Sequence, residues 1–589
     1  MTFRPNFSPS LFIALLLGFL SPAILAKPTQ TGDFAAIDHR GEFHQVSRYG
    51  DQRALVFMSI APNCKADKAP LKVYRQLLDS FADEAVAFFL LDSANSNRSD
   101  LASYSRKQKI DVPVLLDDSQ LISKTLGLHR SGEVAIVDPV TKQLIYRGPV
   151  NDALQADNPA KRATRDYVTE SLSAYLSDKS TNDIDTQIAS NGCAIDTSTQ
   201  QASSEINFNR DIVPILEQRC VSCHREGGIG PFAMDSYPMI RGWAPMIREV
   251  VMSKRMPPGQ IDPQFNHLFQ DVAQLTIPEQ QTLINWIDAG ALLSGKQSND
   301  KHDALADVKI ESPEWQLGEP DLIVEVPAQE IPATGVIDYR YEKIPLNLNQ
   351  DIWVKAVEFL PSAHEVMHHI IAFSLDTPDF SEFQLLTQGV GLGAYAPGNQ
   401  PTVFPDNTGY KLSAGGGLFL QLHYTTSGKA AVDKTRIGMY LLKEPPAIAM
   451  RGGSAAEFNL NIPPNVKESP MTADSTFKQD SYLVTLSPHM HFRGKKIKYT
   501  LFYPDGKEEV ILSVPNYQFN WQKNYDFKTP KFIPAGTRLV VDGAFDNSAT
   551  NPNNPDPNIT VTWGEQSWNE MYFGFYRHFE AQQDALTKR

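Results

Sequence analysis

The chain has 589 residues, which is too long for a single hydrophobic core and predicts three or four domains. Its hydrophobic content of 42% and charged content of 21% are ordinary for globular protein. The net charge of −14 is spread along the sequence without a basic stripe. This argues against nucleic acid as a partner, because nothing would neutralise the phosphates.

The first 26 residues have the pattern of a secretory signal. Arg4 gives a positive start, 11–20 form an apolar run, and Ala26 is a small residue at the expected cleavage point. The alternative is a membrane anchor, but the run is short for a bilayer span. No later segment has about 18 unbroken apolar residues. We therefore expect an exported protein, periplasmic or secreted, without a membrane span in its mature form.

Residues 30–180 alternate strand-like and helix-like segments. A helix-like stretch covers 71–84. Four apolar runs have the length of strands: 54–60, 86–92, 112–117 and 133–138. Alternating elements of this kind predict an α/β domain around a central sheet.

The segment SIAPNCKADKAPL, which follows the first of these strands, resembles the thioredoxin-like redoxin fold, in which a Cys follows the first central strand. Cys64 has no second Cys nearby, and Gly132 and Glu133 stand where that fold has a Pro. We expect a docking or redox-sensing module. Cys64 is then either unreactive or disulfide-bonded to Cys193, a pairing that an exported protein permits.

Residues 181–205 are polar and aperiodic and predict a linker, as do 293–314. Between them, 206–292 predict a helical domain. Thr276 and Glu279 form a capping box for a helix that stops at Gly290.

The helical domain contains the motif CVSCH, at Cys220, Cys223 and His224. This is the attachment signature of haem c, in which His224 is an axial ligand of the iron. A zinc or redox Cys pair is the alternative. Met256 in the stiff segment KRMPPGQ is the favoured second axial ligand, and a Met/His pair suits electron transfer. The other candidates are Met234, Met239, Met246 and Met252. The segment resembles the cytochrome c domains fused to bacterial exported oxidoreductases.

From about 315 the sequence changes to short alternating stretches separated by Pro, Gly and Asn clusters. This pattern predicts an all-β region whose length suits two sandwiches in tandem, at 315–455 and 456–589.

Histidines in this region form two candidate metal-ligand sets. His489 and His491 lie two residues apart on a strand-like segment, so both can reach one ion. Met571 would complete a His2Met site, since imidazole suits both oxidation states of copper and a thioether favours Cu(I). Taken singly, each of these side chains is more often a structural residue.

The second set consists of the neighbours His368 and His369 with the single His423. Neighbours on a regular strand point to opposite faces, so joint ligation requires a bulge or a strand end at this pair.

Four segments, MHHIIAF, LQLHYT, HMHFRGKK and NEMYFGFY, together resemble the copper type II, ascorbate-dependent monooxygenases, which include peptidylglycine α-hydroxylating monooxygenase and dopamine β-monooxygenase. The resemblance covers roughly 320–589 and implies two jelly-roll sandwiches, one per copper. It implies that His368, His369 and His423 hold the electron-transfer copper. His489, His491 and Met571 would hold the copper that binds dioxygen.

The sequence departs from the peptide-hydroxylating member around the second site. Ser487, Phe573 and Phe575 stand where that enzyme has the Arg, Asn and Tyr associated with its substrate. A peptide ending in glycine is therefore not the expected substrate, and the two phenylalanines suit a less polar one.

The main hypothesis is an exported copper monooxygenase that hydroxylates a C–H bond of a small molecule with O2. Its electrons would come through the covalent haem or from a donor such as a reduced cytochrome, a quinol-linked carrier or an ascorbate-like reductant. The first alternative is a non-catalytic haem and copper electron-transfer or copper-binding protein. A weaker alternative is a peroxidase that depends on Cys64.

Overall fold

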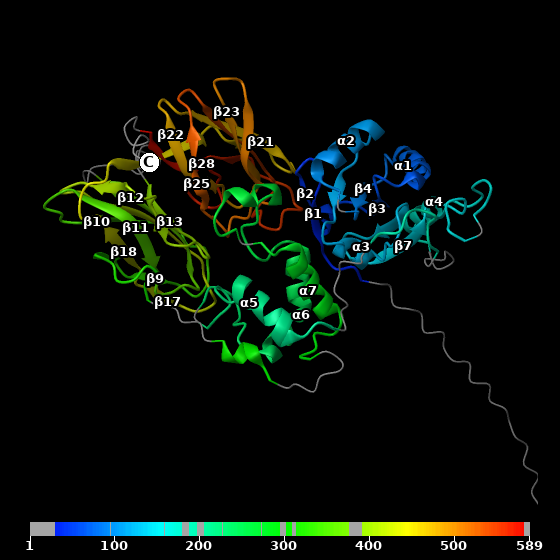
Figure 1. The fold of residues 1–589 in the computed structure, drawn as a ribbon, viewed down its shortest axis with the longest axis horizontal. Coiled ribbons are helices and arrows are strands. Elements are labelled where there is room, and N and C mark those ends of the chain that lie inside the picture. Colours follow the sequence, from blue (N-terminus) through cyan, green and yellow to red (C-terminus); the bar gives the residue numbers. More distant parts are fainter. Residues whose placement is uncertain are drawn as a thin grey trace, which may run out of the picture.

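The structure is a computed structural model in which an α/β unit, a helical unit and a large β-rich region lie side by side (Figure 1). It describes residues 30–94, 96–157, 159–179, 188–196, 205–226, 228–272, 274–294, 302–308, 314–375 and 391–581. The expected signal at 1–26 lies outside these ranges. Within them, no helix has the length and apolar character that a membrane crossing requires.

The α/β unit is built on a five-stranded sheet in the order β5-β4-β3-β6-β7. The strands are β3 (Ala54–Ile60), β4 (Val86–Asp92), β5 (Val114–Leu116), β6 (Glu133–Val137) and β7 (Leu144–Pro149). The helices are α1 (Lys68–Ser80), α2 (Arg98–Gln108), α3 (Leu121–Leu126) and α4 (Tyr167–Leu176). The short elements are β1 (Ala35–Ile37), β2 (Phe43–Gln45), η1 (Val46–Tyr49) and η2 (Lys65–Asp67).

The strand directions give this unit a thioredoxin-like fold. β3 is parallel to β4, and β4 is parallel to β5, whereas β6 runs antiparallel to both β3 and β7. All seven residues of β3 are buried, because the sheet is covered on both faces by apolar side chains. The predicted α/β domain is confirmed, with its four apolar runs forming strands.

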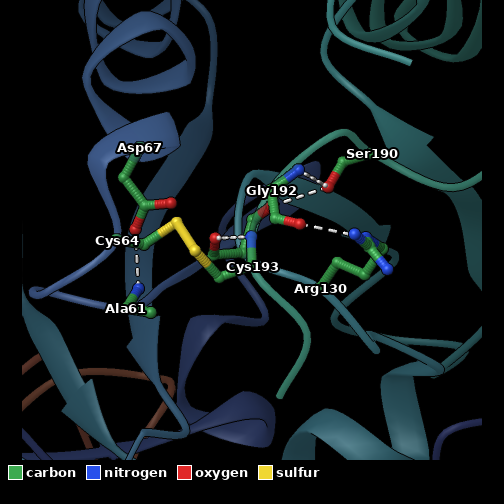
Figure 2. Close-up of a disulfide and its surroundings, with 8 residues drawn as sticks. Ala61, Cys64, Asp67, Arg130, Ser190, Gly192 and Cys193 are labelled. Atoms are coloured by element: carbon green, nitrogen blue, oxygen red, sulfur yellow. Dashed lines mark hydrogen bonds between the residues drawn. A yellow bond between two sulfur atoms is a disulfide. The ribbon is translucent and has the colours of Figure 1, made fainter. Parts of the chain in front are cut away.

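The expected linker at 181–205 is in part wrong. Residues 188–196, here called the strap, lie against the α/β unit and carry Cys193 (Figure 2). Ser131 N donates to Cys193 O at 2.8 Å, and Cys193 N donates to Ser131 Oγ at 3.0 Å. Arg130 Nε donates to Gly192 O at 3.0 Å. A segment held by backbone hydrogen bonds needs no apolar periodicity, so its polar composition did not reveal this docking.

The helical unit begins with η4 (Phe208–Ile212) and continues through four further elements: α5 (Val213–Arg219), α6 (Tyr237–Met252), η5 (Pro263–Leu268) and α7 (Ile277–Asp288). A short turn, η6 (Ala304–Asp307), follows. The predicted capping box is present, since Glu279 N donates to Thr276 Oγ1 and Thr276 N to Glu279 Oε2. That this unit is a cytochrome c domain stays a prediction.

One segment of the expected 206–292 domain belongs to another core. Ile261, Phe265 and Phe269 are buried in the β-rich region, where Asp262 N donates to Ser513 O at 2.9 Å. These three apolar side chains are buried in the core of the neighbouring β-rich region rather than in that of the helical unit. The boundary between the two units is therefore not a single point in the sequence.

The β-rich region contains two lobes. The first has β8 (Leu322–Glu325), β9 (Gln329–Ile331), β10 (Arg340–Pro345), β11 (Ile352–Leu360), β12 (Met367–Leu375), β13 (Gly391–Tyr395), β14 (Thr402–Val403), β15 (Thr408–Leu412), β16 (Gly417–Tyr424), β17 (Ala431–Asp433) and β18 (Arg436–Leu441). The second has β19 (Ile448–Glu457), β20 (Asn461–Ile462), β21 (Ser469–Thr476), β22 (Ser481–His489), β23 (Gly494–Phe502), β24 (Glu508–Val514), β25 (Tyr525–Ile533), β26 (Arg538–Phe545), β27 (Val561–Thr562) and β28 (Tyr572–Glu580).

Each lobe packs one four-stranded sheet against half of a shared nine-stranded sheet. The smaller sheets have the orders β10-β16-β12-β13 and β21-β26-β23-β24. The shared sheet is continuous because β15 pairs in parallel with β19 at Thr408↔Ile448 and Gly409↔Ala449. β19 runs across the boundary expected at 455/456, since its residues from Met450 to Glu457 pair one by one with β28 of the second lobe.

Strand alternation turns one face of β28 toward the first lobe. Tyr572 and Tyr576 are buried in the core of the second lobe. Phe573 lies on the opposite face of the strand and shares an apolar cluster with Phe373 and Phe419 of the first lobe. The lobes therefore meet through a buried contact, and the predicted ligands lie beside it.

Candidate metal centre

Three histidines from two neighbouring strands converge in the first lobe. His368 and His369 lie on β12 and His423 lies on β16, with His369 directly opposite His423 in the register. The register of β12 against β16 shifts between Met367 and His369. An irregularity of this kind is what allows the neighbours His368 and His369 to reach the same site. His368 Nδ1 lies 3.1 Å from His369 Nδ1 and 3.2 Å from His423 Nδ1.

The chemistry of this three-histidine cluster fits a metal ion. One potential ligand nitrogen from each ring lies within 4.8 Å of those of the others, and all three side chains are buried. His369 Nε2 is buried without a hydrogen-bond partner in the described part of the chain. A neutral imidazole has one donor and one acceptor nitrogen, so adjacent Nδ1 atoms cannot all be satisfied by one another.

Burial also holds these rings in the form that binds metals. Desolvation lowers the pKa of His368 to about 4 and the pKa values of His369 and His423 well below the usual value. Neutral imidazole is the metal-ligating form, and copper is among the metals that it suits.

His489 and His491 lie at the end of β22 and just beyond it. Their ring centroids are 5.2 Å apart. Gln522 Oε1 lies 2.7 Å from His489 Nδ1, so an Nδ1–H donor there would leave Nε2 as the acceptor nitrogen. Burial lowers the pKa of His489 to about 4 and that of His491 well below its usual value.

A buried carboxyl group fixes the backbone around His491. Glu570 accepts from His491 N at 2.9 Å and from Arg493 N at 2.6 Å. Glu570 and Arg493 are both fully buried, and desolvation raises the pKa of Glu570 to about 8. Sequence reasoning missed Glu570, although it directly precedes Met571 in a motif that had been singled out.

Met571 is buried, with 2% of its surface exposed, and belongs to the apolar cluster shared by the two lobes. β22 and β28 pair with His489 opposite Phe573. β28 begins at Tyr572, so Met571 directly precedes this paired strand. A role for the Met571 sulfur as a ligand stays a prediction.

The two histidine sets lie against each other at the contact between the lobes. The ring centroids of His369 and His489 are 6.3 Å apart. Tyr339 stands between the sets, with its ring centroid 4.4 Å from that of His423 and its hydroxyl 3.4 Å from His491 Nε2. Phe519 stacks on His368 at 4.7 Å between ring centroids. No sequence signal marked Tyr339 or Phe519.

A cavity of about 160 Å³ opens beside these rings. Its wall includes His369 and His489, one from each lobe, together with Tyr395, Gln522 and Phe575. This volume is an order of magnitude above that required for one water molecule. The cavity can therefore hold a small organic molecule next to both histidine sets.

The CVSCH motif follows α5 and fits a covalent haem. Cys220 and Cys223 are not disulfide-bonded. His224 is 8% exposed, and its Nδ1 lies 3.1 Å from Phe232 O, so an Nδ1–H donor orients the ring with Nε2 as the acceptor. Gly230 makes this possible, because a Cβ there would lie 2.7 Å from the His224 ring.

The methionine candidates differ in their surroundings. Met256 is half-buried in the loop after α6. Met234 and Met252 are buried in hydrophobic cores, whereas Met239 and Met246 are 38% and 43% exposed. The choice of Met256 as second axial ligand stays a prediction.

The cysteine motif lies close to the β-rich region. A Cβ built on Gly398, three residues after β13, would lie 3.8 Å from Cys223 Sγ. Burial raises the pKa of Tyr395, which lies at the end of β13 near Cys223. Tyr395 lines the cavity, so β13 and the loop after it connect the CVSCH motif with the histidine region.

Cys64, in the α/β unit, is disulfide-bonded to Cys193 of the strap (Figure 2). Their Cα atoms are 6.0 Å apart, although 129 positions separate them in sequence. Cys64 is 8% exposed, whereas Cys193 is exposed. Of the two expectations for Cys64, the disulfide is confirmed.

No protein-family model matches the chain, and no curated protein sequence matches it. Solved structures similar to its N-terminal part include a hypothetical protein, SMc02350, from Sinorhizobium meliloti 1021 (20% identity, 28% of this chain and 92% of that chain, TM-score 0.25). They also include an uncharacterised conserved protein from Geobacillus kaustophilus (18%, 30% and 93%, TM-score 0.27) and peroxidoxin BcpB from Mycobacterium tuberculosis (13%, 26% and 97%, TM-score 0.21). With such low TM-scores, these similarities carry no argument about function.

Proposed function

We propose that the chain is an exported, copper-dependent monooxygenase that hydroxylates a C–H bond of a small molecule with O2. Electrons would arrive through a covalent haem c, from an ascorbate-like donor, or from both. The observation that carries this proposal is the meeting of two buried histidine sets, one from each lobe, beside a cavity. Two copper ions bound there would supply dioxygen activation and one-electron steps, which side chains alone cannot provide.

The chain's own residues supply positioning and exclusion of water. Gln522 orients the His489 ring, and Glu570 holds the backbone of His491. Tyr339 and Phe519 fill the space around the rings. Burial keeps all five imidazoles neutral, so protons do not compete with a metal near neutral pH.

The helical unit contains the residues that would bind the haem and so supply the electrons. Cys220 and Cys223 would carry the thioether bonds, and His224 would be one axial ligand, with Met256 proposed as the other. Cys223 faces the loop after β13, whose Tyr395 lines the cavity. A haem attached there would lie on the side of the helical unit that contacts the first lobe.

The test is oxygen uptake by the purified full-length chain, loaded with copper and with its haem reduced, against a panel of small substrates. The proposal expects uptake that is matched by hydroxylated product. Copper and haem uptake without oxygen consumption under any donor would instead establish the electron-transfer or copper-binding alternative.

Replacing Met571 separates a ligand from a packing residue. Met571→Ala is expected to abolish coupled product formation, whereas Met439→Ala, at a fully buried methionine in the first-lobe core, is expected to retain it. Both remove a buried side chain, which costs about 2–5 kcal/mol of stability. A Met571→Ala enzyme that still couples oxygen uptake to product would refute the assigned role.

A further inference from the structure

The charged side chains in the wall of the inter-lobe cavity are cationic. Lys523 and Arg577 line it, and no Asp or Glu is among the described residues of its wall. The cavity is small, at about 160 Å³, so a bound molecule would lie close to both cationic side chains.

Two hydrogen-bond donors of the wall have no partner in the described part of the chain. Arg577 Nη1 and Gln522 Nε2 are both buried and unpaired. An unpaired buried donor costs free energy, more so when the group is charged. Both residues line the cavity, so a ligand with acceptor oxygens bound there is a candidate partner for these donors.

Arg577 is already held in place by its other nitrogens. Its Nε donates to Thr485 Oγ1 at 3.2 Å, and its Nη2 lies 3.3 Å from Asp526 Oδ1. Thr485 also donates to Asp526 Oδ1, and the Asp526 side chain is 41% exposed. Asp526, which is not part of the cavity wall, therefore holds the Arg577 guanidinium in place. Nη1 of Arg577 is left for another acceptor.

We propose that the cavity binds a small organic carboxylate, with its anionic group on Arg577 and beside Lys523. Charge-assisted bonds from guanidinium to carboxylate are short and strong, and Gln522 Nε2 is a further donor. The apolar part of the molecule packs against Phe373 and Phe575, which also line the cavity.

Strand register sets the length of this ligand. Arg577 lies opposite Thr485 and Phe573 lies opposite His489, so four residues of β22 separate the anionic end from the histidine end. At the rise of a strand this is about 13 Å between backbones, which the Arg577 side chain shortens. Given the proposed function, on which this step rests, the reacting C–H bond belongs at the end remote from the carboxylate.

The test is calorimetric titration of the full-length protein without oxygen or reductant. The probes are acetate, benzoate and phenylacetate, each compared with its neutral amide. We expect at least one carboxylate to bind about tenfold or more tightly than its amide, because the neutral amide carries no charge to pair with the guanidinium. Arg577→Gln and Lys523→Gln should reduce this ratio to within about threefold.

Arg451→Gln is the matched control. Arg451 lies on β19, next to β28, and pairs with Glu580 at the surface. This variant should keep the wild-type ratio. The inference is overturned if no carboxylate binds, if amides bind as tightly, or if Arg451→Gln lowers the ratio as much as Arg577→Gln. Because the titration contains no oxygen-dependent step, failure of oxygen uptake counts against the proposed function alone.

Discussion

At the scale of single residues, Gly230 decides whether His224 can keep its orientation. Gly230→Ala would place a methyl group 2.7 Å from the imidazole, too close for any real contact. We expect at least about a twofold loss of covalently attached haem per chain, measured by the haem-to-protein absorbance ratio, since His224, the proposed axial ligand, must move.

The control for this variant lies in the same unit. Gly242 is inside α6, and a Cβ there meets nothing within 4 Å. Gly242→Ala should retain the haem and stabilise the helix by up to about 1 kcal/mol. Equal haem content in both variants would show that the His224 ring has no fixed place near Gly230.

Asp117 makes the stability of the α/β unit depend on pH. Its carboxyl group is fully buried, and it accepts from Ile122 N and Ser123 N at the start of α3. Desolvation raises its pKa from 3.8 to about 6. The folded state therefore holds a proton that the unfolded state releases, so stability falls as pH rises between these two values.

Asp117→Asn removes this titration. Relative to the variant, the wild type should lose about 2–3 kcal/mol between pH 4 and pH 6, measured by chemical unfolding across that range. A difference between the two proteins that stays constant with pH would contradict the raised pKa.

At the scale of elements, the disulfide and the strap form one unit. Cys193→Ser removes a cross-link that closes a loop of 129 positions. We expect a cost of about 2–5 kcal/mol, because a long loop regains much entropy in the unfolded chain. Amide exchange should accelerate at Cys193 and Ser131, whose backbone groups bond each other across the strap.

The same variant has an internal control. Amides of β22 and β28, in the second lobe, should keep their exchange rates. Unchanged exchange in the strap itself would show that backbone hydrogen bonds hold it without the disulfide.

Local patterns in the sequence predicted many of these helices and strands. The apolar runs became β3, β4, β5 and β6, and the pair His368–His369 correctly required an irregular strand. The strap and the insertion of Phe265 and Phe269 were missed. Both depend on long-range contacts, made by a polar segment and by isolated apolar residues that have no periodicity of their own.

At the scale of the whole molecule, the two lobes are joined more closely than tandem domains. β15 and β19 make one continuous sheet, and Met571 and Phe573 pack against Phe373 and Phe419 across the contact. Sequence motifs identified the histidines of each lobe separately. They could not show that His369 and His489 lie together, because that depends on how one folded lobe docks on the other.

This docking places the CVSCH motif, the cavity and both histidine sets close to one another. The loop after β13 contacts Cys223 on one side, while Tyr395 lines the cavity on the other. The proposed function requires such proximity, since electrons from a haem would have to reach the metal one at a time.

The most direct test of the two proposed metal sites is the copper content of the purified, haem-loaded chain, measured by mass spectrometry after dialysis. We expect two copper ions per chain, and one after His423→Ala, because that change breaks only the three-histidine cluster of the first lobe. A folded chain that retains haem but no copper, or a His423→Ala chain that keeps both ions, would contradict it.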